Sequence, residues 1–267
     1  MSGLTNLALE GKAALVTGAS RGIGAAVADA YARAGAAVAL AARDASALER
    51  NAEGIREAGG RAISVPTDVT DPDAVARMVD RVTSEFGRLD VACNNSAGGG
   101  HSPTPLAEVS IEAFDSGIAS SLRGVFLCLK HEIPAMLEGD GGAIVNLSST
   151  AGLQGVGGLA AYVSAKHGVE GLTKVAALDY AGRGVRVNAV APGPILTANL
   201  AHAGEAAQRA AAAAMPLGRV GSPEEVAEAV VWLCSPAAAF ITGATLLIDG
   251  GKLAGTPPFQ VAARNPA

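Results

Sequence analysis

The amino-acid sequence predicts an α/β protein: a Rossmann-type, doubly wound parallel sheet of seven strands with helices on both faces. Strand-like segments alternate with helix-like segments of ten or more residues, which indicates right-handed βαβ crossovers. The length of 267 residues suits one large α/β domain. Hydrophobic residues make up 49% of the chain and aromatic ones only 3%, with 34 glycines, so helices and sheet are expected to pack closely through small side chains.

Short apolar runs, rich in valine, isoleucine, leucine and alanine, are expected to form the strands. Their hydrophobicity fits strands that helices cover on both faces of a parallel sheet. In chain order, the seven runs lie at residues 12–17, 38–42, 62–65, 89–93, 143–147, 185–190 and 245–248.

The segments between these runs are expected to be helical, and several carry start or stop signals. Gly35 and the pair at 59–60 end the first two helices, because glycine readily adopts the left-handed conformation that follows a helix. Asp71 precedes Pro72, and a Ser-Pro-Glu-Glu segment lies at 222–225; both are typical helix starts. The expected helices cover, in order, 23–34, 45–58, a segment after Asp71, 108–136, 161–181 and a segment that starts at Ser222.

One domain is expected over residues 1–255, followed by a C-terminal tail at 256–267, because no repeat or linker divides the chain. The alanine-rich region at about 198–217 is expected to be either a substrate lid or an exposed helix. A net charge of −5 with dispersed lysines and arginines argues against a nucleic-acid partner and against a polybasic membrane anchor.

The sequence also favours a cytoplasmic protein without membrane contact. Residues 1–10 lack the basic and apolar regions of a signal peptide, and no run of about 18 apolar residues is present. Cys93, Cys128 and Cys234 lie far apart, without metal-ligand spacing. We expect buried thiols in a reducing compartment and no bound metal.

A glycine-rich turn joins the first expected strand to the first expected helix. It reads Thr-Gly-Ala-Ser-Arg-Gly-Ile-Gly at residues 17–24. Glycines let the backbone turn sharply and approach a pyrophosphate, whose charge the helix N-terminus stabilises. Between a strand and a helix at the start of a βαβ array, such a turn predicts a dinucleotide site.

The end of the second expected strand indicates which dinucleotide fits. An acidic residue there would bond the ribose 2′-hydroxyl of NAD, whereas a cation accommodates the 2′-phosphate of NADP. Ala42 stands where an aspartate would be expected, Arg43 follows it, and Arg21 offers a second cation from the glycine turn. We therefore favour NADP(H) over NAD(H), while Asp44 argues for NAD(H).

Tyr162 and Lys166 lie four residues apart on an expected helix, so both side chains share one face. A free tyrosine has a pKa of about 10, too high for efficient proton exchange near neutrality. A nearby ammonium is expected to lower the pKa of Tyr162, and the same lysine can bond a ribose hydroxyl. The pair predicts an acid–base group; a solvated pair on a helix surface is the alternative.

Polar or Gly/Pro-containing segments follow several expected strands. Ser148 and Ser149 follow the fifth strand, two asparagines close the fourth at 94–95, and Pro-Gly-Pro-Ile-Leu-Thr follows the sixth at 192–197. Ligands in open α/β sheets bind at the carboxyl ends of strands, so these segments are expected on one rim. A hydroxyl there can stabilise charge that develops on a substrate oxygen.

Jointly these residues resemble the short-chain dehydrogenase/reductase family, in its short single-domain branch. The resemblance implies hydride transfer between a nicotinamide and a carbonyl carbon, while Tyr162 exchanges the proton of the oxygen. It also implies a homotetramer that takes a small-molecule carbonyl or alcohol substrate. It covers about residues 9–251 and rests on the glycine turn, Asp68-Val69, the 94–98 segment, Ser149, Tyr162, Lys166, Asn188 and the 192–197 loop.

The family pattern implies further roles. Ser149, thirteen residues before the tyrosine, is implied to be catalytic. Asp68 is implied to bond the adenine and Asn94 to approach the cofactor ribose, while Ile195 and Thr197 are implied to hold the nicotinamide carboxamide. The implied cofactor-binding residues are Gly18, Ser20, Arg21, Gly22, Ile23, Gly24, Arg43, Asp68, Val69, Asn94, Asn95, Ala97, Gly98, Tyr162, Lys166, Pro192, Gly193, Ile195 and Thr197.

Two departures from the family pattern affect the expected site. The segment Asn-Asn-Ser-Ala-Gly at 94–98 has one residue more than the usual Asn-Asn-Ala-Gly, so either asparagine can take the ribose-facing place. Ser121 stands where the family has an asparagine that helps to hold a water in the proton relay to the lysine. We count Ser121 among the catalytic residues and expect a relay that is weakened or rerouted rather than abolished.

The leading hypothesis is an NADP(H)-dependent oxidoreductase that interconverts a ketone or aldehyde and an alcohol. An NAD(H)-preferring secondary-alcohol dehydrogenase is an alternative. Sugar-nucleotide epimerases and dehydratases also use a Tyr-Lys pair, but they have a separate substrate domain, for which little sequence remains after Pro192. The remaining alternative, a non-catalytic NADP-binding sensor or scaffold, rests on Ser121 alone.

Overall fold

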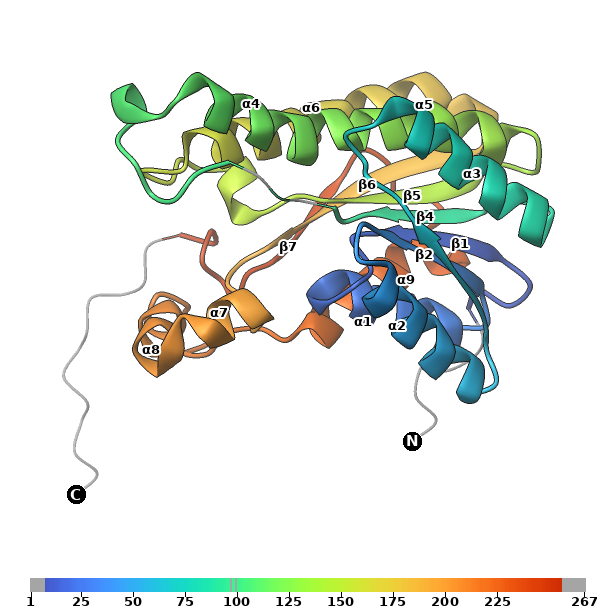
Figure 1. Cartoon of the computed structure of the whole chain (residues 1–267), viewed down its shortest axis with the longest axis horizontal. Coiled ribbons are helices and arrows are strands. Elements are labelled where there is room, and N and C mark those ends of the chain that lie inside the picture. The colour runs from blue at the N-terminus through green and yellow to red at the C-terminus, as the bar shows by residue number, and fades with distance from the viewer. Residues whose placement is uncertain (1–7, 97, 99, 256–267) are drawn as a thin grey trace.

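The computed structural model describes residues 8–96, 98 and 100–255, and the chain forms one parallel sheet there (Figure 1). The strand order is β3-β2-β1-β4-β5-β6-β7. The prediction of a Rossmann-type, doubly wound sheet of seven strands is confirmed. The strands are β1 (Ala13–Thr17), β2 (Ala37–Ala42), β3 (Arg61–Pro66), β4 (Val91–Asn94), β5 (Gly142–Leu147), β6 (Val185–Pro192) and β7 (Thr245–Ile248).

The chain winds outward from the middle of the sheet in two directions. β1 to β3 extend one way and β4 to β7 the other, so the order reverses between β1 and β4. At this reversal Thr17 of β1 pairs with Asn94 of β4. The carboxyl ends of all strands lie along one edge, called here the C-terminal rim, and doubly wound sheets bind their ligands at such a reversal point.

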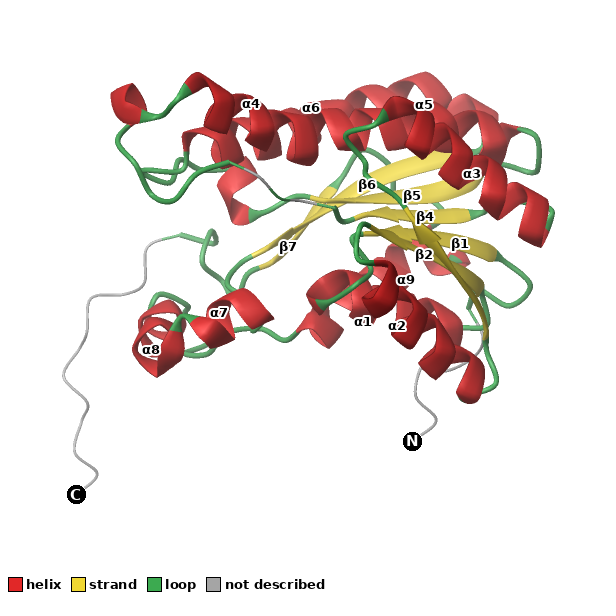
Figure 2. Ribbon diagram, in the orientation of Figure 1, coloured by secondary structure: helices red, strands yellow, loops and turns green. Residues whose placement is uncertain are grey.

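Helices cover both faces of the sheet (Figure 2). Each face has its own cluster of buried hydrophobic residues, and β1 and β2 are buried along their whole length, as expected for strands between two helical layers. One layer contains α1 (Gly22–Arg33), α2 (Ala45–Glu57) and α9 (Pro223–Cys234), and the other contains α3 (Pro72–Phe86), α4 (Ile111–Ile118), α5 (Gly124–Leu137) and α6 (Ala160–Tyr180).

Two predicted helix starts are confirmed by their capping bonds. Asp71 caps α3, because its carboxylate accepts the N–H of Asp73 at 2.9 Å. Ser222 and Glu225 form a capping box at the start of α9, in which each side chain accepts the backbone N–H of the other residue. Such side chains fix where a helix begins, since they satisfy N–H groups that have no partner within the helix.

The single helix predicted at 108–136 is interrupted. A 3₁₀ turn, η1 (Leu106–Glu108), comes first, and α4 begins only after Ser110, whose hydroxyl caps its first turn. A π-helical turn, η2 (Ala119–Arg123), then separates α4 from α5. Hydrophobic spacing did not reveal η2, because a π turn changes the hydrogen-bond register without ending the helix.

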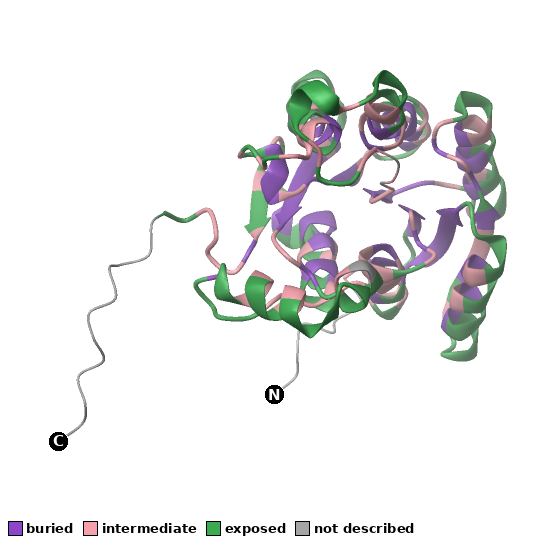
Figure 3. Ribbon diagram, turned by 60° about the vertical axis from the view of Figure 1, so that its left-hand side comes forward, coloured by how far each residue is buried: buried purple, intermediate pink, exposed green. Residues whose placement is uncertain are grey.

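The alanine-rich region predicted as a lid or an exposed helix forms two short helices, α7 (Ala198–His202) and α8 (Gly204–Ala213). They lie beside the end of β7, apart from the two helical layers (Figure 1). α8 contains no buried residue, and Figure 3 shows its outer side exposed. A lid function for this region stays a prediction. Within residues 8–96, 98 and 100–255, each helix is too short or too polar to span a membrane.

Candidate active site

The glycine turn lies at the C-terminal rim, between β1 and α1. Gly18 and Gly22 have φ angles of 67° and 57°, a backbone conformation that glycine adopts readily. Gly24 is required by packing, because a Cβ there would lie 2.3 Å from the carbonyl oxygen of Gly18. Arg21, the N-cap residue of α1, makes no capping bond through its side chain. The first N–H groups of α1 are therefore left for an anionic ligand.

Asn95, rather than Asn94, lies against the glycine turn. Its Nδ2 donates to the carbonyl oxygens of Thr17 and Gly18, each at 3.1 Å. The side chain of Asn94 is buried and donates to Glu132 Oε2 at 2.9 Å, in the interior of the protein. An approach of Asn94 to the cofactor ribose stays a prediction, and its side chain is engaged in the interior by Glu132 and Asn146. Successive side chains of a strand point to opposite faces, and that of Asn94 points toward α5.

Arg43, which follows β2, and Asp68, which follows β3, lie near each other at the C-terminal rim. The pKa of Asp68 is lowered chiefly because its carboxylate accepts the backbone N–H of Thr70, while burial opposes this and the Arg43 guanidinium adds to it. Arg43 also lies close to Gly98, in the segment after β4. Ala97, expected beside them, lies outside the described residues.

Asp44, the residue that favours NAD(H) in the sequence analysis, caps a helix. Its Oδ1 accepts the N–H of Ala47 at 3.0 Å and so caps α2. Arg43 and Arg21 are both exposed at this rim. The two guanidinium groups are therefore accessible to an anionic group of a ligand, whereas the carboxylate of Asp44 is engaged by a helix.

The loop after β6 approaches both the glycine turn and the end of β7. Gly193 packs so closely on Asp249 that a Cβ would lie 3.0 Å from its Cα atom. Thr197 lies beside Gly22, since its Cγ2 would be 3.4 Å from a Cβ at that glycine. The other predicted cofactor residues also belong to these rim segments: Ser20 and Ile23 in the glycine turn and α1, Val69 against Gly124, Pro192 at the end of β6 and Ile195, which is buried.

Lys166 is 1% exposed, which is rare for a lysine. Its Nζ donates to the carbonyl oxygen of Leu147 at 2.6 Å and ties α6 to the end of β5. Burial lowers the pKa of Lys166 to about 8, whereas the nearby Glu170 carboxylate acts to raise it. The ammonium is thus fixed in one place and is still mostly protonated near neutral pH.

Tyr162 lies one turn before Lys166 and is 37% exposed. Partial burial raises the pKa of Tyr162, while the Ser149 hydroxyl acts to lower it. The Nζ of Lys166 is 5.7 Å from the centre of the tyrosine ring. In this structure the ammonium of Lys166 is turned to Leu147, and the contribution that lowers the pKa of Tyr162 comes from Ser149. The effect of the ammonium on this pKa stays a prediction.

Ser149 follows β5 and begins the 3₁₀ turn η3 (Thr150–Gly152), where its Oγ accepts the N–H of Ala151 at 3.1 Å. Ser148 is buried, and its Oγ has no partner among the described residues. Of the two serines, Ser149 is therefore the one beside the tyrosine. The fold brings together the hydroxyls of Ser149 and Tyr162 and, one helical turn away, the ammonium of Lys166.

Ser121, the fourth predicted catalytic residue, is 2% exposed and lies in the π turn η2. This turn packs against α6, the helix that carries Tyr162 and Lys166. Within the described part of the chain, no direct hydrogen bond joins Ser121 to Lys166. A relay between them would therefore need an intervening group such as a water.

Several buried polar side chains near this site were missed by the sequence analysis. They occupy positions that face the core, and a polar residue at such a position is the signal that could have identified them. Asn146 donates to Thr173 at 2.9 Å, and Glu170 accepts the hydroxyl hydrogen of Thr245. These residues are Glu132 on α5, Asn146 on β5, and Glu170 and Thr173 on α6.

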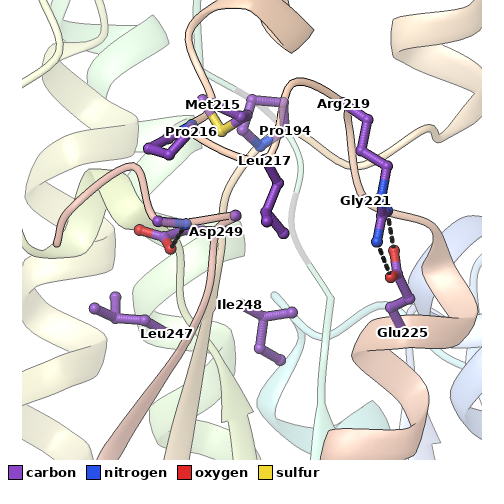
Figure 4. Close-up of a pocket in the computed structure, with 12 residues that line it drawn as sticks. Pro194, Met215, Pro216, Leu217, Arg219, Gly221, Glu225, Leu247, Ile248 and Asp249 are labelled. Carbon is purple, nitrogen blue, oxygen red and sulfur yellow. Dashed lines mark hydrogen bonds and ion pairs between the residues drawn. The ribbon is translucent and has the colours of Figure 1, made fainter. Parts of the chain in front are cut away.

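A cavity of about 450 Å³ lies where β6, β7 and the end of the 198–217 region meet (Figure 4). Its lining is mostly apolar, and the ion pair between Arg219 and Glu225, 2.6 Å apart, lies at one side. None of the three grouped residues, Ser149, Tyr162 and Lys166, lines it, so it is separate from them. The lining residues are Pro194, Met215, Pro216, Leu217, Arg219, Gly221, Glu225, Leu247, Ile248, Asp249, Gly250 and Gly251.

A metal centre has no candidate here. Within residues 8–96, 98 and 100–255, no three histidine, cysteine, aspartate or glutamate side chains are grouped so that they could hold a metal ion. The three cysteines are buried and free.

Comparison with known proteins agrees with this geometry. A family model described as enoyl-(acyl carrier protein) reductase matches residues 18–252. The chain is 45% identical to cis-4-hydroxycyclohexanecarboxylate dehydrogenase of Sinomonas cyclohexanicum over 243 residues, 91% of this chain and 97% of that protein. It is 44% identical to the A-factor type gamma-butyrolactone 1'-reductase (1S-forming) of Streptomyces virginiae over 247 residues, 91% and 96% of the two chains. The crystal structure of a short-chain type dehydrogenase/reductase from Mycobacterium marinum superposes with a TM-score of 0.86 at 38% identity, over 94% of this chain and 99% of that one.

Proposed function

The chain belongs to the short-chain dehydrogenase/reductase family and is an alcohol/carbonyl oxidoreductase. From this premise we propose that the enzyme depends on NADP(H) and uses Tyr162 as its acid–base group. The substrate class proposed is a ketone or aldehyde and the corresponding alcohol. The observation that carries the proposal is the grouping of Ser149, Tyr162 and a fully buried Lys166 at the C-terminal rim.

The proposed chemistry follows from what these groups can do. A nicotinamide cofactor held at the rim would supply the hydride to the carbonyl carbon in reduction and would accept it from the alcohol carbon in oxidation. In reduction, the hydroxyl of Tyr162 donates its proton to the carbonyl oxygen, and in oxidation the phenolate accepts the proton of the alcohol. The hydroxyl of Ser149 donates a hydrogen bond to the same oxygen, which stabilises the charge that develops there.

Lys166 supports this exchange from its fixed place under Tyr162. Its ammonium is held by the Leu147 carbonyl, 5.7 Å from the centre of the tyrosine ring, where its positive charge would stabilise the phenolate that forms when the proton leaves. The raised pKa of Tyr162 without a ligand fits a general acid that keeps its proton until substrate binds. The proton that leaves must then be replaced from solvent through a relay.

The rim fits a dinucleotide. The positive φ angles of Gly18 and Gly22 and the uncapped start of α1 allow a diphosphate to approach backbone N–H groups. Asp68 would lie toward the adenine, and the loop with Thr197 toward the nicotinamide. Two exposed arginines, Arg43 and Arg21, support the proposed preference for a 2′-phosphate, and so does the use of Asp44 as a helix cap.

Replacing Arg43 by alanine is expected to weaken NADPH binding by roughly tenfold to a hundredfold, the cost of one charge-assisted hydrogen bond to a phosphate. The affinity for NADH should change little, because NADH lacks the 2′-phosphate. Titration of both cofactors by fluorescence measures the ratio of the two dissociation constants. Arg50→Ala, an exposed arginine on α2, is the matched control, and an unchanged ratio in Arg43→Ala would refute the role of this guanidinium.

We further propose that Ser121 takes the part of the usual asparagine in the proton relay, at reduced efficiency. Its place in η2, packed on α6, supports this. Ser121→Asn is expected to raise kcat by about two- to tenfold and to shift the pH profile of kcat, since a longer amide reaches a bridging water more easily. Stopped-flow and steady-state rates across pH measure this, with Ser116→Asn on α4 as control; identical profiles would exclude Ser121 from the relay.

A panel of ketones, aldehydes and secondary alcohols, each assayed with NADP(H) and NAD(H), tests the proposed function directly. Turnover with NADPH and a carbonyl compound is the expected result. Turnover only with NAD(H) would reject the NADP(H) assignment but keep the enzyme class. Tight NADPH binding without turnover of any compound would favour a sensor or scaffold instead.

We propose a homotetramer as the assembly. Large apolar side chains are exposed on α9, on the edge strand β7 and between them, where Phe240 is fully exposed and Trp232, Leu246 and Leu247 are partly so. Large apolar side chains on neighbouring elements can form an association surface, which supports this proposal. Sedimentation equilibrium of the purified protein measures the mass of the assembly. A mass four times that of the chain is expected, and another multiple would reject the homotetramer.

A further inference from the structure

Glu132 is a carboxyl group in the middle of the protein, with no exposed surface. It extends from α5 to the end of β4, where its Oε2 accepts one hydrogen from Asn94 Nδ2 at 2.9 Å. Its other oxygen, Oε1, has no partner among the described residues. A carboxylate with a single donor would be poorly stabilised there, because burial removes the water that otherwise solvates its charge.

The hydrogens around this carboxyl can be assigned one by one. Asn94 Nδ2 has two, and it gives one to Glu132 and the other to Asn146 Oδ1 at 3.1 Å. Asn146 Nδ2 donates to Thr173 Oγ1 at 2.9 Å, and the Thr173 hydroxyl donates to the Val169 carbonyl at 2.8 Å. Two acceptors are left over within this cluster, Asn94 Oδ1 and Glu132 Oε1. One further hydrogen shared between these two oxygens would satisfy both of them.

The charges that surround Glu132 do not favour its ionised form. The nearest titratable groups are neutral thiols and a phenol, Cys128 on α5, Cys93 on β4 and Tyr31 on α1, and their pKa values are raised by burial and in part by Glu132. The charged groups on the other packed elements are paired or exposed. They are the ion-paired or exposed charges of α3, Arg186 of β6 bonded to two carbonyl oxygens, Lys166 of α6 bonded to Leu147, and Glu170 of α6 bonded to Thr245.

We propose that Glu132 is a neutral carboxylic acid whose hydroxyl donates to Asn94 Oδ1, so that the two side chains form a closed acid–amide pair. One proton on Oε1 supplies this further hydrogen and satisfies both remaining acceptors of the cluster. Burial raises the pKa of Glu132 to about 7, against the lowering effect of the Asn94 hydrogen bond, which agrees with a proton held there.

This pair makes Glu132 a positioning residue for the dinucleotide site. It holds Asn94, and the next residue, Asn95, holds the glycine turn through the carbonyl oxygens of Thr17 and Gly18. The backbone N–H of Asn95 also donates to Thr17 Oγ1 at 3.1 Å. The protonation of Glu132 is thus linked to the conformation of the glycine turn in three steps: the hydrogen bond to Asn94, the peptide bond from Asn94 to Asn95, and the hydrogen bonds of Asn95.

A proton held in the folded state makes stability depend on pH with a definite sign. The pKa of Glu132 is about 7 in the folded chain and 4.5 for the free side chain. Between these values the folded chain keeps a proton that the unfolded chain has lost. The stabilisation is complete below pH 4.5 and is lost as the pH rises through 7. Between these two values the unfolding equilibrium constant rises about tenfold for each pH unit.

The decisive variant is Glu132→Gln, because a glutamine accepts from Asn94 Nδ2 and donates to Asn94 Oδ1 at every pH. The ratio of the unfolding equilibrium constants of wild type and Glu132→Gln is expected to rise about tenfold per pH unit from pH 5 to 7. Denaturant unfolding over this range measures it. Glu138→Gln, an exposed position just after α5, is the matched control and should leave the ratio constant.

Two further readouts separate positioning from a general loss of stability. In deuterated buffer, the infrared C=O band of a protonated carboxyl group should be present in wild type at pH 6 and in Glu138→Gln, and absent in Glu132→Gln. Glu132→Ala should bind NADPH at least tenfold more weakly, whereas Glu132→Gln should bind it within about twofold of wild type. A pH-independent unfolding ratio together with no such infrared band would overturn the proposal, because Glu132 would then be ionised.

Discussion

Replacing Tyr162 by phenylalanine is expected to lower kcat by about 10²- to 10⁴-fold, the usual contribution of a positioned acid–base group. Phenylalanine keeps the ring and removes only the hydroxyl that exchanges the proton. The NADPH dissociation constant should change far less than kcat, since the glycine turn and Lys166 are untouched. The loss of turnover with retained cofactor binding separates the proton step from the binding site.

The measurement is steady-state turnover of the best carbonyl substrate, together with cofactor titration of the same preparation. Tyr180→Phe, at the end of the same helix and without a lysine four residues later, is the matched control. It should retain wild-type turnover. If Tyr162→Phe kept more than a tenth of the wild-type kcat, another group would have to carry the proton.

Lys166→Met is expected to lower kcat/KM by roughly 10²- to 10³-fold, as for the loss of one preorganised electrostatic interaction. Methionine fills a similar space without the charge, so the effect can be ascribed to the ammonium. Lys174→Met, exposed on the same helix, is the control. KM is expected to rise while kcat falls, because Lys166 is also expected to bond the cofactor ribose.

The pH profile gives an independent test of the same charge. Burial lowers the pKa of Lys166 to about 8, so the ammonium is present below that pH and is lost above it. In the reduction direction, kcat/KM of the wild type is expected to be flat below pH 8 and to fall about tenfold per unit above it. A profile in Lys166→Met with the same fall would assign this pKa to another group.

Much of the fold was predictable because it depends on local patterns. The alternation of apolar runs with helix-forming segments predicted the parallel sheet, and Asp71 and Ser222 marked helix starts that capping bonds confirm. The predicted helix at 108–136 was wrong in detail, since Ser110 delays its start and a π turn divides it. The register of a backbone hydrogen bond leaves no trace in hydrophobic spacing.

The candidate site was predictable in its residues but not in all of their contacts. Spacing predicted that Tyr162 and Lys166 share a helix face, and the family pattern selected Ser149. Spacing could not decide that the ammonium of Lys166 turns to a backbone carbonyl of β5. Nor could it separate Asn94 from Asn95, because one residue of difference at a strand end reverses the face to which a side chain points.

The sequence by itself determined the fold class, the glycine-rich turn and the placement of Tyr162 and Lys166 on one face of a helix, because each depends on short-range order along the chain. Only the tertiary structure decided where charges and protons reside. Glu132 and Asn94 are 38 residues apart, yet they meet in the interior of the protein. The protonation of a carboxyl group depends on its burial and on its hydrogen-bond partners, and both are properties of the packed protein rather than of any segment.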